Sequence, residues 1–65
     1  MIDYKLLEAL AMVVQEGGFE KAAGMMNLTQ SAVSQRVRLL EERAGKILLS
    51  RTSPPRPTDA GQKLI

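Results

Sequence analysis

The side chains best suited to chemistry gather in one short segment of this chain of 65 residues. A glutamine amide can bond adenine through two hydrogen bonds, a serine hydroxyl can bond base edges or phosphates, and an arginine can pair with guanine or hold phosphate. Side chains of these kinds stand at Thr29, Gln30, Ser31, Ser34, Gln35, Arg36 and Arg38. The segment therefore predicts contact with double-stranded DNA.

Helical spacing gives this segment an apolar side and a polar side. The apolar side is centred on Val33, and the later apolar residues lie within about 40° of it. These residues are Val37, Leu40 and Ala44. We expect this side to pack on two preceding helices. The polar side carries the candidates for contact with base edges, which are Gln30, Ser31, Ser34, Gln35 and, further along, Arg38.

Several of these positions have a second interpretation. Thr29 can cap the helix with or without an added phosphate contact. Arg36 and Arg43 project about 60 to 80° from the apolar axis, so they suit phosphate contact or simple solvation better than contact with bases. Gln30 and Ser34, each taken alone, could be ordinary surface residues.

The basic charge lies in the second half of the chain. Residues 1 to 28 hold two basic and four acidic side chains, whereas residues 29 to 65 hold seven basic and three acidic ones. This distribution favours a surface for a polyanion over residues 29 to 65, although a solvated face also explains it. Arg51 and Arg56 flank a proline-rich turn, where either phosphate or minor-groove contact or a solvated turn is expected.

Caps and turn residues define the elements that must position these side chains. Asp3 caps a first helix that Gly17 and Gly18 end, and residues 19 to 26 form a second helix before a tight turn at Asn27. Thr29 caps the third helix, which ends before Gly45. Residues 47 to 52 predict a strand, residues 53 to 55 a turn and residues 56 to 57 a minimal second strand. Residues 58 to 65 begin a further helix. The fold class is mainly α, with three helices, a short β-hairpin wing and a fourth helix.

The composition gives little support to catalysis or membrane insertion. The chain has no cysteine and no histidine, and so lacks the commonest zinc ligands and general base. Glu41 and Glu42 are adjacent, so they do not converge on one face of a helix. We expect no enzymatic activity and no cofactor or metal in this domain. The longest apolar run, residues 9 to 14, is far short of the roughly 18 residues of a membrane span, and we expect a cytoplasmic protein.

A set of short motifs in one register resembles the N-terminal domain of LysR-type transcription regulators. The motifs are Gly17-Gly18-Phe19, Ala22-Ala23, the run from Thr29 to Ser34, Leu40-Glu41, Gly45, Leu48-Leu49, Arg51-Thr52, Thr58 and Ala60-Gly61. They span nearly the whole chain. The run Thr-Gln-Ser-Ala-Val-Ser-Gln-Arg together with Pro-Pro-Arg-Pro-Thr is also similar to the arginine- and lysine-responsive branch of that family, the regulators of arginine export and chromosome initiation.

The resemblance implies a winged helix-turn-helix DNA-binding domain over residues 1–57 and the start of a linker helix over residues 58–65. It implies DNA contacts at Thr29, Gln30, Ser31, Ser34 and Gln35 on the recognition helix and at Arg51, Arg56 and Pro57 on the wing. It also implies a separate effector domain that binds a small molecule, a homodimer formed through the linker helix, a higher oligomer of the full-length protein, and a place at the nucleoid. Many members have proline at the position of Ser31 and arginine at that of Gln35, so their base preference is not transferred.

Two other kinds of binding module compete with this interpretation. A winged helix used for protein–protein interaction predicts an apolar or aromatic outer face, and the polar set at Ser31, Ser34, Gln35 and Arg38 argues against it. A module for single-stranded nucleic acid stacks bases on exposed aromatic rings. This chain has only Tyr4 and Phe19, and we expect Phe19 in the core.

Overall fold

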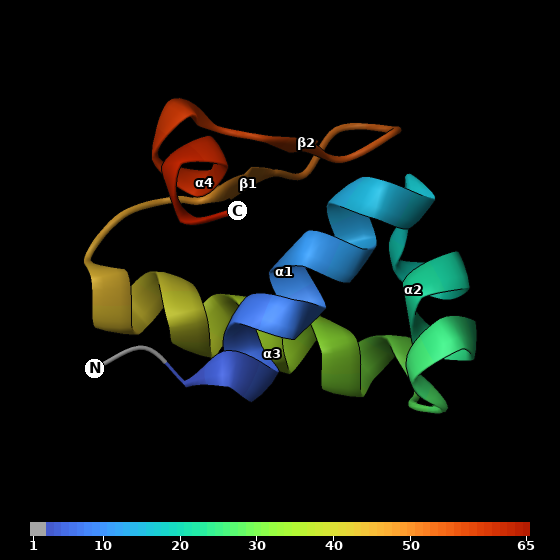
Figure 1. Ribbon diagram of the computed structural model, residues 1–65. Coiled ribbons are helices and arrows are strands. Elements are labelled where there is room, and N and C mark those ends of the chain that lie inside the picture. Colours follow the sequence, from blue (N-terminus) through green and yellow to red (C-terminus); the bar gives the residue numbers. More distant parts are fainter. Residues whose placement is uncertain (1–2) are drawn as a thin grey trace.

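The computed structural model describes residues 3–65, so residues 1 and 2, with which the predicted domain begins, lie outside the described part. The elements follow the predicted order (Figure 1). They are α1 (Tyr4–Glu16), α2 (Phe19–Met26), α3 (Gln30–Ala44), β1 (Leu49–Ser50), β2 (Arg56–Pro57) and α4 (Asp59–Leu64). Residues 3–65 contain no helix long and apolar enough to cross a membrane.

The predicted caps fix the ends of the first helices. The Asp3 carboxylate accepts a hydrogen bond of 2.9 Å from the Lys5 amide at the start of α1. Gly17 ends α1 in the left-handed conformation, with φ 77°, which glycine adopts without a steric penalty. Asn27 ends α2 in the same region, with φ 58°, so the turn into α3 occurs where the sequence predicts it.

The core lies where α1, α2 and α3 meet. Each helix contributes the apolar side that its spacing predicts, and the chain leading into β1 covers one end. The buried apolar residues are Leu6, Ala9, Leu10, Val13, Ala22, Ala23, Val33, Val37, Leu40, Leu48 and Leu49. Phe19 packs against this cluster but is only half-buried. The described residues thus form the mainly helical, winged helix-turn-helix arrangement that the sequence predicts.

The hairpin is shorter than the strand predicted over residues 47 to 52. Only Leu49 and Ser50 pair, with Pro57 and Arg56 respectively, in an antiparallel ladder. Ile47 is 66% exposed, and the Leu48 and Leu49 amides donate to a side chain of α3 instead of to a strand. Prolines cannot donate to a ladder, so the second strand also stays minimal.

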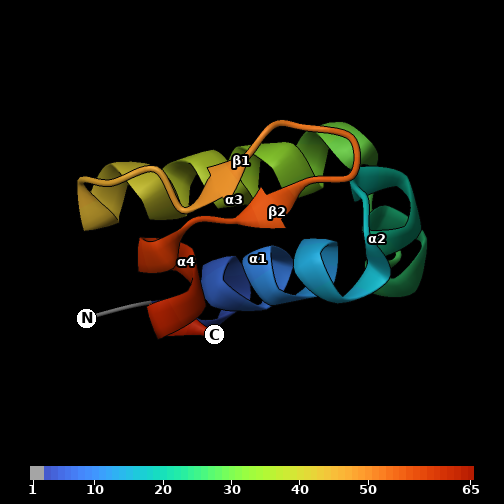
Figure 2. The same ribbon diagram turned by 90° about the horizontal axis from the view of Figure 1, so that it is seen from above.

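The prediction of which residues of α3 are buried is wrong at one position. Ala44, predicted to pack on α1 and α2, is exposed, because the last turn of α3 extends beyond α1, as both Figure 1 and Figure 2 show. Glu41, which lies about 80° from Val33 on the wheel, is buried instead. The side of α3 that the wing approaches therefore carries a buried charge.

Helix α4 packs back on the entry to the hairpin. Thr58 caps it by accepting from the Gly61 amide at 3.1 Å, and its hydroxyl also donates to the Ile47 carbonyl oxygen at 2.7 Å. The Thr58 amide donates to the Leu48 carbonyl oxygen at 3.0 Å. Figures 1 and 2 both place α4 beside the hairpin. The segment 58–65 is therefore bonded to the residues before the wing.

Candidate nucleic-acid interface

The outer side of α3 presents polar side chains that have no partner within the described residues. Gln30, Ser31, Gln35 and Arg38 are exposed, and Ser34 is half-buried. Over residues 3–65, none of these side chains takes part in a recorded hydrogen bond or ion pair. Their donors and acceptors are thus open to a ligand, and they run along one helix whose opposite side packs in the core.

Thr29 and Arg36 occupy the margins of this side. The Thr29 hydroxyl oxygen accepts a bond of 3.0 Å from the Ala32 amide, so Thr29 is the N-cap of α3. Its hydroxyl proton is still available to an acceptor such as a phosphate. Arg36 is half-buried and Arg43 is exposed. Phosphate contact by these arginines stays a prediction.

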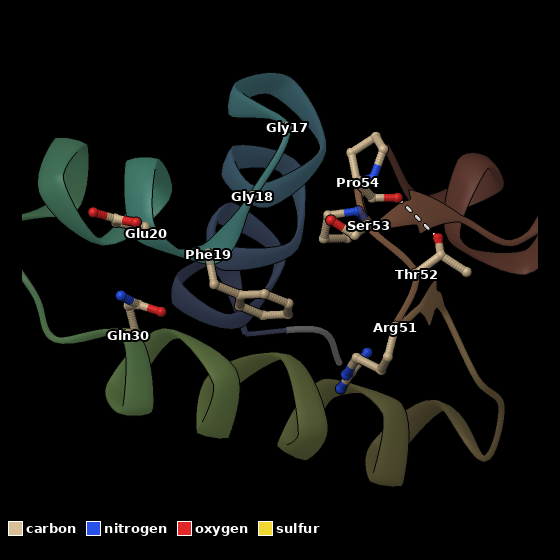
Figure 3. Close-up of a pocket in the computed structure, with 10 residues that line it drawn as sticks. Gly17, Gly18, Phe19, Glu20, Gln30, Arg51, Thr52, Ser53 and Pro54 are labelled. Carbon is tan, nitrogen blue, oxygen red and sulfur yellow. Dashed lines mark hydrogen bonds between the residues drawn. The ribbon is translucent and has the colours of Figure 1, made fainter.

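The wing turn lies at the same end of the molecule as the start of α3. A hollow of about 520 Å³ separates them, and it is lined by residues 17–20, Gln30 and residues 51–55. Figure 3 shows Gln30 on one side of this hollow and Ser53 and Pro54 on the other, with the start of α2 between them. Glu20 also lines it, so the hollow is of mixed charge.

The two arginines of the wing differ in their surroundings. Arg56 in β2 is exposed, and its side chain has no recorded partner in residues 3–65. Arg51 is engaged inside the molecule: its Nη1 donates to the Leu49 carbonyl oxygen at 3.0 Å and its Nη2 to Glu41 Oε1 at 3.1 Å. Its guanidinium carbon lies 5.7 Å from the centroid of the Phe19 ring, within the range of a cation–π contact. Pro57 is half-buried in the ladder.

Glu41 is the residue of this region that sequence reasoning missed. Its Oε2 accepts from the Leu48 and Leu49 amides at 2.9 and 3.2 Å, and its Oε1 accepts from Arg51. The side chain is 10% exposed. The signal that could have indicated burial is its spacing, because Glu41 follows Val33 by eight residues and Val37 by four, at the edge of the apolar side.

The arrangement defines a class of protein. A short helix, a tight turn and a longer helix with an unpartnered polar side, followed by a small hairpin at one end of that helix, form a winged helix-turn-helix domain. In such domains the second helix of the motif fits the major groove, which is about 12 Å wide.

Comparison with known proteins gives the family. A family model described as "Bacterial regulatory helix-turn-helix protein, lysR family" matches residues 4–62. The chain therefore belongs to the LysR family, a family of transcriptional regulators and not a class of enzymes. This confirms the resemblance on which the sequence analysis drew.

Relatives named ArgP agree with the predicted branch. The HTH-type transcriptional regulator ArgP of Pseudomonas aeruginosa (strain UCBPP-PA14) is 58% identical over 65 residues, which cover 100% of this chain and 22% of that protein. The crystal structure of ArgP from Mycobacterium tuberculosis superposes with a TM-score of 0.94 at 45% identity, over 98% of this chain and 24% of that one. The chain thus spans about a fifth of the length of the curated relatives it matches.

A solved structure that includes DNA is also similar. The DNA-binding domain of BenM, in a complex with catB site 1 DNA, has a TM-score of 0.91 at 31% identity, over 97% of this chain and 71% of that one. This chain is accordingly the helix-turn-helix DNA-binding domain of a LysR-type regulator.

Proposed function

We propose that this domain binds a specific sequence of double-stranded DNA, with α3 in the major groove and the wing on the backbone or in the minor groove. The observation that carries the proposal is the side of α3 whose polar groups have no partner in residues 3–65. Buried polar groups are nearly always paired, and exposed ones along a rigid helix are the arrangement that base recognition uses.

The residues take different roles in this proposal. Gln30, Ser31, Ser34 and Gln35 contact base edges, with Arg38 further along the same groove. Thr29 and Arg36 contact phosphate at the margins of the groove. Arg56 and Pro57 place the wing on the backbone, and the exposed part of Arg51, which is 38% of its side chain, adds positive potential beside it.

The wider organisation is also part of the proposal. Residues 1–57 form the DNA-binding domain and residues 58–65 begin a linker helix through which two copies pair, so that two recognition helices reach neighbouring major grooves. In the full-length protein a further domain binds a small-molecule effector, and the dimers assemble further. A regulator of bacterial genes acts in the cytoplasm, on the nucleoid.

The test is fluorescence anisotropy of the chain with labelled duplex DNA of mixed sequence and with the matching single strand, each titrated with salt. We expect binding to duplex in preference to single strand, weakening steeply with salt at a slope of about 0.9 per neutralised phosphate. If a folded sample binds no duplex at low salt, the same titration is repeated on a protein extended through the full linker helix. Binding by the extended protein shows that pairing is required; no binding by either contradicts the proposal and favours the alternative, a winged-helix module for protein–protein interaction.

A further inference from the structure

We propose that Glu41 is a positioning residue for DNA binding: its buried carboxylate holds the wing in place relative to the polar side of α3. This inference rests on the proposed function, and it gives a role in that function to a buried side chain that is not itself among the proposed DNA contacts. Helix α3, the proposed recognition helix, thus supplies the carboxylate that orients the wing, which is the second surface proposed to contact DNA.

Both oxygens of the Glu41 carboxylate accept hydrogen bonds. Oε2 accepts from two successive amides, those of Leu48 and Leu49, at 2.9 and 3.2 Å. Oε1 accepts from Arg51 at 3.1 Å. Hydrogen bonds to a charged acceptor are stronger than neutral ones, and a buried carboxylate that lost them would carry a large desolvation penalty. The entry to the wing is therefore fixed to α3 at three donors.

Arg51 extends this connection to a third element. Its guanidinium also donates to the Leu49 carbonyl oxygen and stacks over the Phe19 ring at the start of α2. Figure 3 shows Arg51 directed at α3 with the Phe19 ring beside it. One guanidinium thus links the wing to both helices of the helix-turn-helix.

Over the part of the chain that the structure describes, the other hydrogen bonds of the wing join its own strands and the chain beside it, not α3: Ser50 Oγ donates to the Arg56 carbonyl oxygen and the Thr58 amide to the Leu48 carbonyl oxygen. The ladder pairs only Leu49 with Pro57 and Ser50 with Arg56 among the described residues, and Pro57 has no amide hydrogen to donate. The buried side chains of Leu48 and Leu49 anchor the base of the wing in the core. Within residues 3–65 the hydrogen bonds that join the wing to α3 are those of the Glu41 carboxylate, and in this proposal they set the angle at which the turn leaves that base.

The substitution Glu41→Gln separates positioning from simple electrostatics by the sign of its effect. An amide has one acceptor oxygen and an NH₂ group, so it cannot serve the two amides and Arg51 together. It also removes a negative charge, and a DNA-binding surface with less negative charge binds every duplex more tightly. Positioning therefore predicts weaker binding, whereas a bystander carboxylate predicts tighter binding.

The matched control is Glu42→Gln, next along the same helix. Glu42 is exposed, and its side chain has no recorded partner in residues 3–65, so it undergoes the same change of charge without loss of a contact. Glu41→Asp is a second variant: it keeps the charge and shortens the reach of the carboxylate. A loss of binding in this variant arises from geometry.

The experiment measures anisotropy with mixed-sequence duplex over a range of salt, on samples whose folded fraction is checked by circular dichroism. We expect Glu41→Gln and Glu41→Asp to bind about 3- to 30-fold more weakly than the unchanged chain, with a salt slope lower by about one phosphate, and Glu42→Gln to bind as tightly or more tightly. Partial unfolding alone lowers the active fraction and leaves the slope of the folded molecules unchanged. Binding by Glu41→Gln that matches Glu42→Gln overturns the inference.

A measurement without DNA keeps this inference distinct from the proposed function. Amide hydrogen exchange and NMR shifts of residues 48–56 report the placement of the wing directly. We expect faster exchange at Leu48 and Leu49 and shifts through the turn in Glu41→Gln, with neither in Glu42→Gln. If the unchanged chain binds no duplex, the proposed function fails, and the role of Glu41 in DNA binding fails with it. If amide exchange at Leu48 and Leu49 is unchanged in Glu41→Gln, Glu41 does not position the wing, whether or not the chain binds DNA.

Discussion

Gly61 of α4 lies directly against the backbone carbonyl of Leu48, so closely that a β-carbon at Gly61 would overlap the carbonyl oxygen. The atoms it would meet belong to the backbone, which cannot turn aside as a flexible side chain does. We therefore expect Gly61→Ala to destabilise the domain by about 1 to 3 kcal/mol, the usual effect of overpacking. The measurement is the midpoint of urea unfolding.

A second glycine provides the control for that substitution. Gly24, inside α2, is exposed, and a β-carbon there would meet nothing within 4 Å. Alanine favours the helix over glycine by about 0.5 to 1 kcal/mol. Gly24→Ala should raise the unfolding midpoint while Gly61→Ala lowers it. Equal effects of the two changes would show that close packing of α4 on Leu48 does not contribute to stability.

Gly18 leaves the start of α2 without a side-chain cap. Its backbone is extended, a β-carbon there meets nothing within 4 Å, and no side chain accepts from the first amides of α2. A serine at this position supplies the missing acceptor and reduces the entropy of the unfolded chain. We expect Gly18→Ser to add about 0.5 kcal/mol of stability, which raises the Tm by about 2 to 4 °C. Gly18→Ala, which adds only the β-carbon, isolates the share of the hydroxyl.

Sequence periodicity predicted which helices form but ranked two positions of α3 in the wrong order. Ala44 lies near the centre of the apolar side and is exposed, whereas Glu41 lies at its edge and is buried. A helical wheel gives direction only. Burial also depends on what covers each turn: the last turn of α3 extends past the start of α1 (Figure 2), and the chain entering β1 brings two amide donors to Glu41.

In the candidate site too, features set by neighbouring residues could be predicted from the sequence, and contacts between residues far apart in the chain could not. The polar side of α3 and its cap at Thr29 could be predicted because residue type and helical spacing determine both. The contacts of Arg51 with Glu41 and Phe19 could not, because they join residues ten and more positions apart whose approach depends on packing of the wing. Composition alone gives Arg51 and Arg56 the same role in the wing.

The structure predicts different effects for these two arginines. Arg51→Ala removes the partner of a mostly buried carboxylate and should destabilise the domain by about 1 to 2 kcal/mol. Arg56→Ala removes an exposed charge and should leave stability within about 0.5 kcal/mol. For DNA, Arg56→Ala should lower the salt slope by about one phosphate and weaken all duplexes alike. Thermal unfolding and salt-dependent anisotropy on both variants check this difference between the two arginines. Similar losses of stability in Arg51→Ala and Arg56→Ala would contradict it.

Contacts with bases and contacts with phosphates should separate in the same assay. Gln30 stands at the start of α3 with its amide free of recorded partners in residues 3–65, where it can bond adenine through two hydrogen bonds. Gln30→Ala should reduce the preference for a selected duplex over a mixed one by about 1 to 3 kcal/mol while the salt slope stays the same, because no phosphate contact is lost. Gln15→Ala, the same change on an exposed position of α1, should alter neither quantity. If Gln30→Ala instead weakened both duplexes equally, the amide would contact the backbone, and discrimination would have to come from Ser31, Ser34 and Gln35.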